Sequence, residues 1–100
     1  MSHQIHESRS LSLHRLVAER LRQDPESVIR FALDNLARWS RQGVDCDDYK
    51  IWKDLLVGHP EKLVDVLTRI TEDAIRLRQS SPFAGLIPEG ERRRILAAVE

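Results

Sequence analysis

The sequence predicts an all-α protein, a compact array of about five helices. Apolar residues recur at intervals of three and four along most of the chain, and no stretch alternates apolar and polar residues as a strand would. One hundred residues suit one domain, and 41% hydrophobic with 32% charged residues is typical of a chain that folds. We therefore expect a single helical domain over residues 11–100, preceded by a flexible polar arm at 1–10.

The first two expected helices cover residues 12–23 and 25–42. Ser12 is a good N-cap, and the apolar residues after it share one helical face. Asp24, Pro25 and Glu26 supply a capping acid, a proline at the first helical position and a further first-turn acid. Gly43 then ends the second helix as a left-handed residue.

The next two expected helices cover residues 47–57 and 60–79. Asp45, Asp47 and Asp48 precede an apolar run, where acids favour a helix N-terminus. From 60 to 79 the apolar residues stay in phase, which favours one long helix, but Thr71 followed by two acids is also a typical helix start. The sequence leaves open whether this helix is continuous or broken near residue 71.

Pro82 ends that helix, and Pro88 suits the first position of a last helix over 88–99. The apolar face of the last helix is thin, so a second copy of the chain could cover it, and a homodimer is one possible state. Trp39, Tyr49 and Trp52 lie on the inner faces of the second and third helices, and we expect them to meet as the aromatic centre of the fold.

Several function classes find no support in the sequence. The formal net charge is zero, so no global attraction to nucleic acid or membranes is expected. The single Cys46 allows no internal disulfide, and the four histidines are too scattered for a metal site. The chain starts without an apolar leader and has no apolar run of membrane-spanning length, so we expect a cytoplasmic protein without membrane contact.

The segment from Arg76 to Arg94 is the candidate binding site. Phe83 lies in a Ser-Pro/Ala-Gly break between two groups of arginines, where it either packs back on the helices or stands out as an anchor, as exposed aromatics flanked by arginine do at interfaces. The residues predicted to contact a partner are Arg76, Arg78, Gln79, Phe83, Arg92, Arg93 and Arg94. We predict no catalytic residue, no metal site and no cofactor.

The chain resembles a group of small all-helical bacterial proteins associated with toxin–antitoxin-like gene pairs. The resemblance lies in two segments, "SLHR" at Ser12–Arg15 and "LRQSSPFAG" at Leu77–Gly85. The likeness spans most of the chain and is specific in the longer motif, whereas the sequence after Gly85 departs from it. The resemblance implies a recurring module with a protein partner, one that a neighbouring gene could encode.

The leading hypothesis is a non-enzymatic, antitoxin-like regulator that binds a protein partner through the C-terminal Arg/Phe segment. The alternative is a DNA-binding transcriptional regulator that uses the last helix, where Arg92, Arg93 and Arg94 follow one another. A third hypothesis, a small ribonuclease, rests only on the spacing of Arg9 and His14.

Overall fold

The computed structural model describes residues 2–99, with side chains described for residues 7–98. Within these bounds the chain forms six α-helices and one 3₁₀ turn, and no strand. The elements are α1 (Ser2–Gln23), α2 (Pro25–Arg41), α3 (Asp47–Gly58), η1 (Pro60–Lys62), α4 (Leu63–Thr68), α5 (Glu72–Gln79) and α6 (Glu89–Val99). The all-α prediction is confirmed, but the expected number of about five helices is wrong by one.

The additional helix comes from a break between α4 and α5. Arg69 and Thr71 adopt extended backbone, with ψ angles of 153° and 155°, and the Thr71 hydroxyl accepts a hydrogen bond from the backbone N–H of Ala74 at 3.3 Å. Thr71 is therefore the N-cap of a new helix, as one of the two sequence alternatives proposed. The apolar residues keep the same helical spacing on both sides of the break because α4 and α5 bury them against the same core.

The first helix also differs from its prediction, because α1 begins at Ser2 instead of residue 12. The backbone is thus helical through most of the stretch for which a flexible arm was expected, and Met1 lies outside the described residues. Glu7, in this early part of α1, accepts a hydrogen bond from Arg78 of α5. A partner 71 positions away leaves no trace in the local sequence pattern.

The predicted signals at both ends of α2 are confirmed. Asp24 Oδ1 accepts from the backbone N–H of Ser27 at 3.3 Å, and Pro25 is the first helical residue. Gly43 follows the C-terminus with a φ angle of 81°, in the left-handed region that favours glycine.

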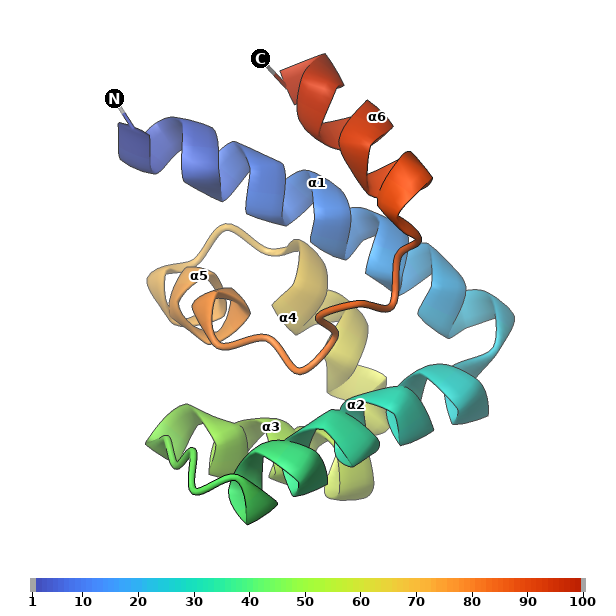
Figure 1. Cartoon of the computed structure of the whole chain (residues 1–100), viewed down its shortest axis with the longest axis vertical. Helices are drawn as coiled ribbons and strands as arrows, with labels where there is room; N and C mark the ends of the chain where they lie inside the picture. Colours follow the sequence, from blue (N-terminus) through green and yellow to red (C-terminus); the bar gives the residue numbers. More distant parts are fainter. Residues whose placement is uncertain (1, 100) are drawn as a thin grey trace.

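The helices are arranged in three tiers around a common core (Figure 1). α1 and α6 lie together at the top of this view, α4 and α5 occupy the middle, and α2 and α3 lie below them. α1 contacts α2, α4, α5 and α6, so it connects all three tiers. The apolar side of α6, which includes the half-buried Ile95 and Leu96, is covered by α1 of the same chain.

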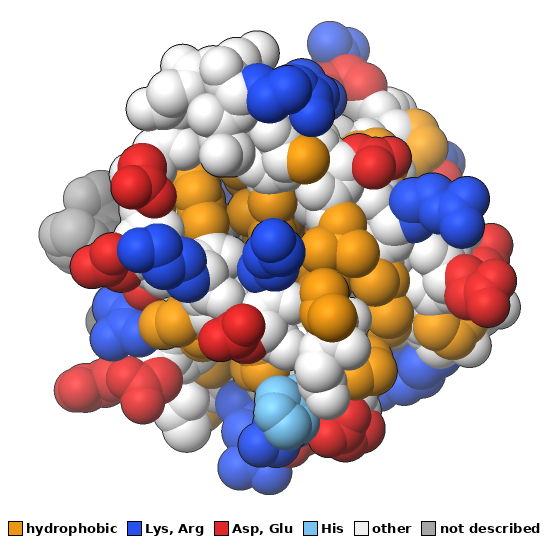
Figure 2. Space-filling model, turned by 90° about the horizontal axis from the view of Figure 1, so that it is seen from below, with side chains coloured by type: hydrophobic (Ala, Val, Ile, Leu, Met, Phe, Trp, Pro, Cys, Tyr) orange, Lys and Arg blue, Asp and Glu red, His pale blue; other side chains and the backbone are white. Residues whose placement is uncertain are grey.

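The core collects side chains from every tier. Its buried apolar members are Val17, Ala18, Leu21, Val28, Ala32, Leu36, Trp52, Leu56, Leu63, Leu67, Leu77, Phe83 and Ile87. On the side that carries α2 and α3, apolar side chains remain accessible in the middle of the face and are surrounded by charged ones (Figure 2). Among the described residues, no helix is long and apolar enough to cross a membrane.

The aromatic residues form two pairs instead of one expected group of three. Trp39 and Tyr49 meet with ring centroids 5.3 Å apart. Trp52 instead packs edge-to-face on Phe83, at 5.6 Å and an interplanar angle of 85°, and its Nε1 donates to the carbonyl oxygen of Leu77 at 2.9 Å. Both rings of this second pair are buried.

Phe83 therefore occupies the packed position of the two that the sequence allowed, and its prediction as an exposed partner anchor is corrected. Its ring is 4% exposed and lies in the core against Trp52. An aromatic ring in this position gains more from burial among apolar neighbours than it would gain at the surface. Phe83 thus fills part of the core of its own chain.

Replacement of Phe83 by Ala is expected to lower the free energy of unfolding by about 3 to 5 kcal/mol, because the lost ring leaves a cavity beside Trp52. Urea denaturation followed by circular dichroism measures the loss. Val57→Ala is the control, since Val57 is 65% exposed and should change stability little. A loss under about 1 kcal/mol for Phe83→Ala would contradict the packing role.

Candidate functional site

A groove with a volume of about 490 Å³ lies between α1, the segment 79–88 and the start of α6. Its apolar floor consists of Leu13, Val17, Phe83 and Ile87. Its exposed or half-exposed rim carries Gln79, Ser81, Ala84, Glu89 and Arg92. His14 and Arg78 are buried at one side of it. The groove thus combines a hydrophobic floor with hydrogen-bonding and charged groups at its edge.

The wall formed by residues 82–85 is held in place by a buried amide. Asn35 Nδ2 on α2 donates to the carbonyl oxygens of Pro82 and Ala84, at 2.8 and 3.1 Å. Asn35 Oδ1 in turn accepts from Nη2 of Arg38 at 2.8 Å. Gly85 completes the turn with a φ angle of 88°, which a residue with a side chain adopts only with strain. The wall is therefore fixed relative to α2 by its own carbonyl groups.

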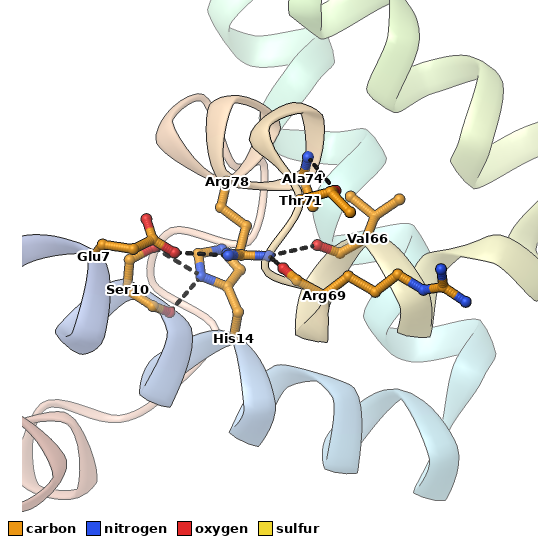
Figure 3. A network of polar contacts seen from close by, with 8 residues as sticks. All are labelled: Glu7, Ser10, His14, Val66, Arg69, Thr71, Ala74 and Arg78. Carbon is orange, nitrogen blue, oxygen red and sulfur yellow. Dashed lines mark hydrogen bonds and ion pairs between the residues drawn. The ribbon is translucent and has the colours of Figure 1, made fainter. Parts of the chain in front are cut away.

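The guanidinium of Arg78 is buried where α1, α4 and α5 meet (Figure 3). Nη1 donates to the carbonyl oxygens of Val66 and Arg69, at 3.0 and 2.6 Å, and Nη2 donates to Glu7 Oε1 at 2.6 Å. These carbonyls belong to the end of α4, which has no further helical turn to bond them. Arg78 therefore serves as a C-terminal cap of α4 and as a buried ion-pair partner of α1.

His14 lies beside this cluster and is buried with it (Figure 3). Its Nδ1 is 2.7 Å from the carbonyl oxygen of Ser10, to which a protonated Nδ1 donates. Burial lowers the pKa of His14 below its usual 6.5, and the charge of Arg78 acts in the same direction. The hydrogen bond to Ser10 and the charge of Glu7 partly oppose this shift. His14 is thus held in its neutral form at neutral pH.

The two carboxylates of α6, Glu89 and Glu91, pair with different arginines. Glu91 is bound by Arg20 of α1, whose Nη2 donates to both of its oxygens at 2.8 and 2.6 Å. Glu89 lies 3.2 Å from Nε of Arg93 and 3.9 Å from Nη1 of Arg92. The exposed side of α6 therefore presents three arginines against one carboxylate, because Glu91 is already neutralised by α1.

The structure brings four of the seven predicted site residues to one place. Arg78, Gln79, Phe83 and Arg92 line the groove, with Phe83 in its buried floor and Arg78 buried at its side. Arg93 and Arg94 are exposed on α6, and Arg94 has no hydrogen bond or ion pair among the described side chains.

Arg76 points elsewhere. Its guanidinium lies 3.6 Å from Asp48 of α3 and 3.7 Å from Asp73 of α5. Three further lining residues, Leu13, His14 and Val17, were not expected from the sequence, because they look like ordinary helix residues and reach the groove only where α1 passes behind it. A local pattern carries no signal for such a role.

Among the described residues, no group of three or more histidine, cysteine or acidic side chains is placed to hold a metal ion. Comparison of the chain with protein-family models, with curated proteins and with solved structures found no match in any of the three. The groove and its neighbouring arginines are therefore interpreted from their own chemistry.

Replacing Arg78 with Met, which keeps the aliphatic stem, is expected to lower the free energy of unfolding by about 3 kcal/mol. The change leaves two carbonyls and a partly buried carboxylate without their donor. Arg69→Met is the matched control, because Arg69 makes only an exposed ion pair with Asp65. Equal losses in the two variants, measured by urea denaturation, would contradict the capping role.

The lowered pKa of His14 predicts a specific pH dependence of stability. Since the unfolded chain binds this proton more readily than the folded one, His14 has no effect well above pH 6.5, and the free energy of unfolding falls as the pH drops below 6.5. His14→Gln should show a shallower fall over the same range in denaturation curves. Parallel curves for the two proteins would refute the assignment.

Proposed function

We propose that the protein is a non-enzymatic binding module of regulatory type, which takes a segment of a protein partner into the groove between α1 and α6. The observation that carries the proposal is the combination in one groove of an apolar floor and an arginine-bearing rim. Its volume of about 490 Å³ lies in the range of pockets that hold a small ligand or a few side chains. Leu13, Val17, Phe83 and Ile87 would contact an inserted apolar side chain.

The charges at the rim indicate what surrounds that inserted side chain. Arg92 lines the groove, and it shares the single carboxylate of Glu89, another lining residue, with the exposed Arg93. Carboxylates of a partner would pair with these two guanidinium groups at the edge of an apolar contact. The proposed partner segment is therefore an apolar residue flanked by acids.

The partner to be tested first follows from the sequence resemblance. Small helical bacterial proteins with an LRQSSPFAG-type motif are associated with toxin–antitoxin-like gene pairs, so we propose that the neighbouring gene encodes the partner and that the chain acts in an antitoxin-like manner. In this chain the motif's Leu77, Arg78, Pro82 and Phe83 are buried. These four residues would thus maintain the fold, while Gln79, Ser81 and Ala84 of the same motif would contact the partner at the rim.

Binding of DNA by α6 is the weaker candidate. Three successive arginines are suited to phosphate contacts, but they occupy a single helical turn, and Glu89 lies within 4 Å of two of them. The chain as a whole carries no net charge that would add to their attraction.

Coexpression with the neighbouring gene product, followed by size-exclusion chromatography and titration calorimetry, tests the proposal. Reversal of charge in Arg92→Glu with Arg93→Glu is expected to weaken the complex by about tenfold or more, since it places like charges against the acidic segment. Ala84→Leu, which narrows the groove without a change of charge, should weaken it as well.

The matched controls lie on α2, away from the groove. Arg30→Glu with Arg41→Glu makes the same change of charge, and Ala37→Leu makes the same change of size, at exposed positions. Absence of a complex with the wild-type chain, or equal weakening by test and control variants, would refute the groove as the partner site. Tight binding to the chain's own promoter DNA that falls steeply with salt would favour the DNA hypothesis instead.

A further inference from the structure

A second groove, of about 320 Å³, lies between α3, α4 and α5 and shares no lining residue with the first. Leu55 of α3, Val66 of α4, and Ala74 and Leu77 of α5 provide its apolar lining. Ala74 and Leu77 are buried, whereas Leu55 and Val66 are only half-buried. The groove thus leaves apolar surface open to solvent at the junction of three helices.

Two exposed isoleucines lie close in the chain to residues that line this groove. Ile70 lies in the corner between α4 and α5, where both of its chain neighbours, Arg69 and Thr71, line the groove. Ile70 is 74% exposed, more than the other exposed large hydrophobic residues of the described chain, which are Val44, Ile51 and Val57. Ile51 is 39% exposed and precedes Leu55 by one helical turn, so it lies on the same side of α3. An exposed aliphatic side chain thus lies next in the chain to two residues that line an apolar recess.

We propose that this surface binds a second copy of the same chain, with Ile70 of each copy entering the groove of the other. Two-fold symmetric interfaces use the same patch on both molecules, so the patch must contain both the projecting group and its recess. The patch of α3, α4 and α5 meets that requirement. The inference does not depend on the proposed partner groove, which lies at α1 and α6.

The charges around the second groove favour a second copy over a strongly charged partner. Its rim carries two cations, Lys62 and Arg69, and two anions, Asp65 and Asp73. In an antiparallel pair of copies, the cations of one rim can face the anions of the other. Because the chain has zero net charge, two copies do not repel each other as they approach.

The charged residues of the rim predict one ion pair across the interface. Arg69 and Asp65 already face each other at 3.4 Å, and Asp73 lies 3.7 Å from Arg76 at its own exposed position. Lys62 has no ion pair among the described side chains. Lys62 precedes α4 and Asp73 follows the α4–α5 corner, so an antiparallel arrangement brings Lys62 of one copy toward Asp73 of the other.

Sedimentation equilibrium of the full chain over a range of concentrations tests the interface. The wild-type mass is expected to rise from 11.6 kDa toward twice that value as concentration increases. Ile70→Asp should raise the dissociation constant by about tenfold or more, because it places a carboxylate in an apolar recess. The substitution leaves the core intact, since Ile70 packs on no buried residue cluster.

Val57→Asp is the matched control. Val57 is 65% exposed, and it lies two positions after Leu55, which puts it about 200° around α3 from the groove. It should leave the dissociation constant unchanged. A wild-type chain that stays at 11.6 kDa at the highest concentration, or equal weakening by Ile70→Asp and Val57→Asp, overturns the proposal.

The charge pairing has its own test. Lys62→Asp and Asp73→Lys should each weaken the dimer several-fold, and the two changes together should restore it, because the opposite charges are then exchanged across the two-fold axis. Circular dichroism of each variant checks that α5 keeps its helix after the change in its first turn. A double variant no tighter than either single one overturns the antiparallel arrangement.

Discussion

The packing of α1, α4 and α5 against one another depends on the buried guanidinium of Arg78. A buried cation needs acceptors for its donors, and here Glu7 and the carbonyls of Val66 and Arg69 accept from Nη1 and Nη2, while Nε is buried without a partner. α4 must end where those carbonyls are free, α5 must restart at an angle that returns Arg78 to them, and α1 must extend back to Glu7. The early part of α1 and the break between α4 and α5 thus both supply acceptors to this one group.

The Leu77–Gly85 motif takes on a structural meaning in this setting. The carbonyl of Leu77 accepts from Trp52, Arg78 caps α4, and Phe83 packs on Trp52. Gly85 adopts a positive φ angle at the end of the turn. These residues of the motif are therefore used inside the fold, whereas Gln79, Ser81 and Ala84 lie at the rim of the groove between α1 and α6.

The zero net charge of the chain conceals a local imbalance on α6. Arg20 reaches across from α1 and binds both oxygens of Glu91, so the carboxylate that would offset the arginine run is already neutralised. Around the groove of α3, α4 and α5 the charges stay balanced. The two surfaces thus differ in charge, although they belong to one small domain.

The sequence by itself determined the all-α class, the capped start of α2 at Asp24 and its glycine stop at Gly43, because these caps depend on backbone groups within one turn, whereas it offered the N-cap at Thr71 only as one of two alternatives. Only the tertiary structure decided that α1 extends back past Glu7, that Phe83 is packed against Trp52 and that His14 joins a groove with Arg92. These features depend on residues dozens of positions apart. Periodicity reports which face of a helix is buried, but not which helix covers it.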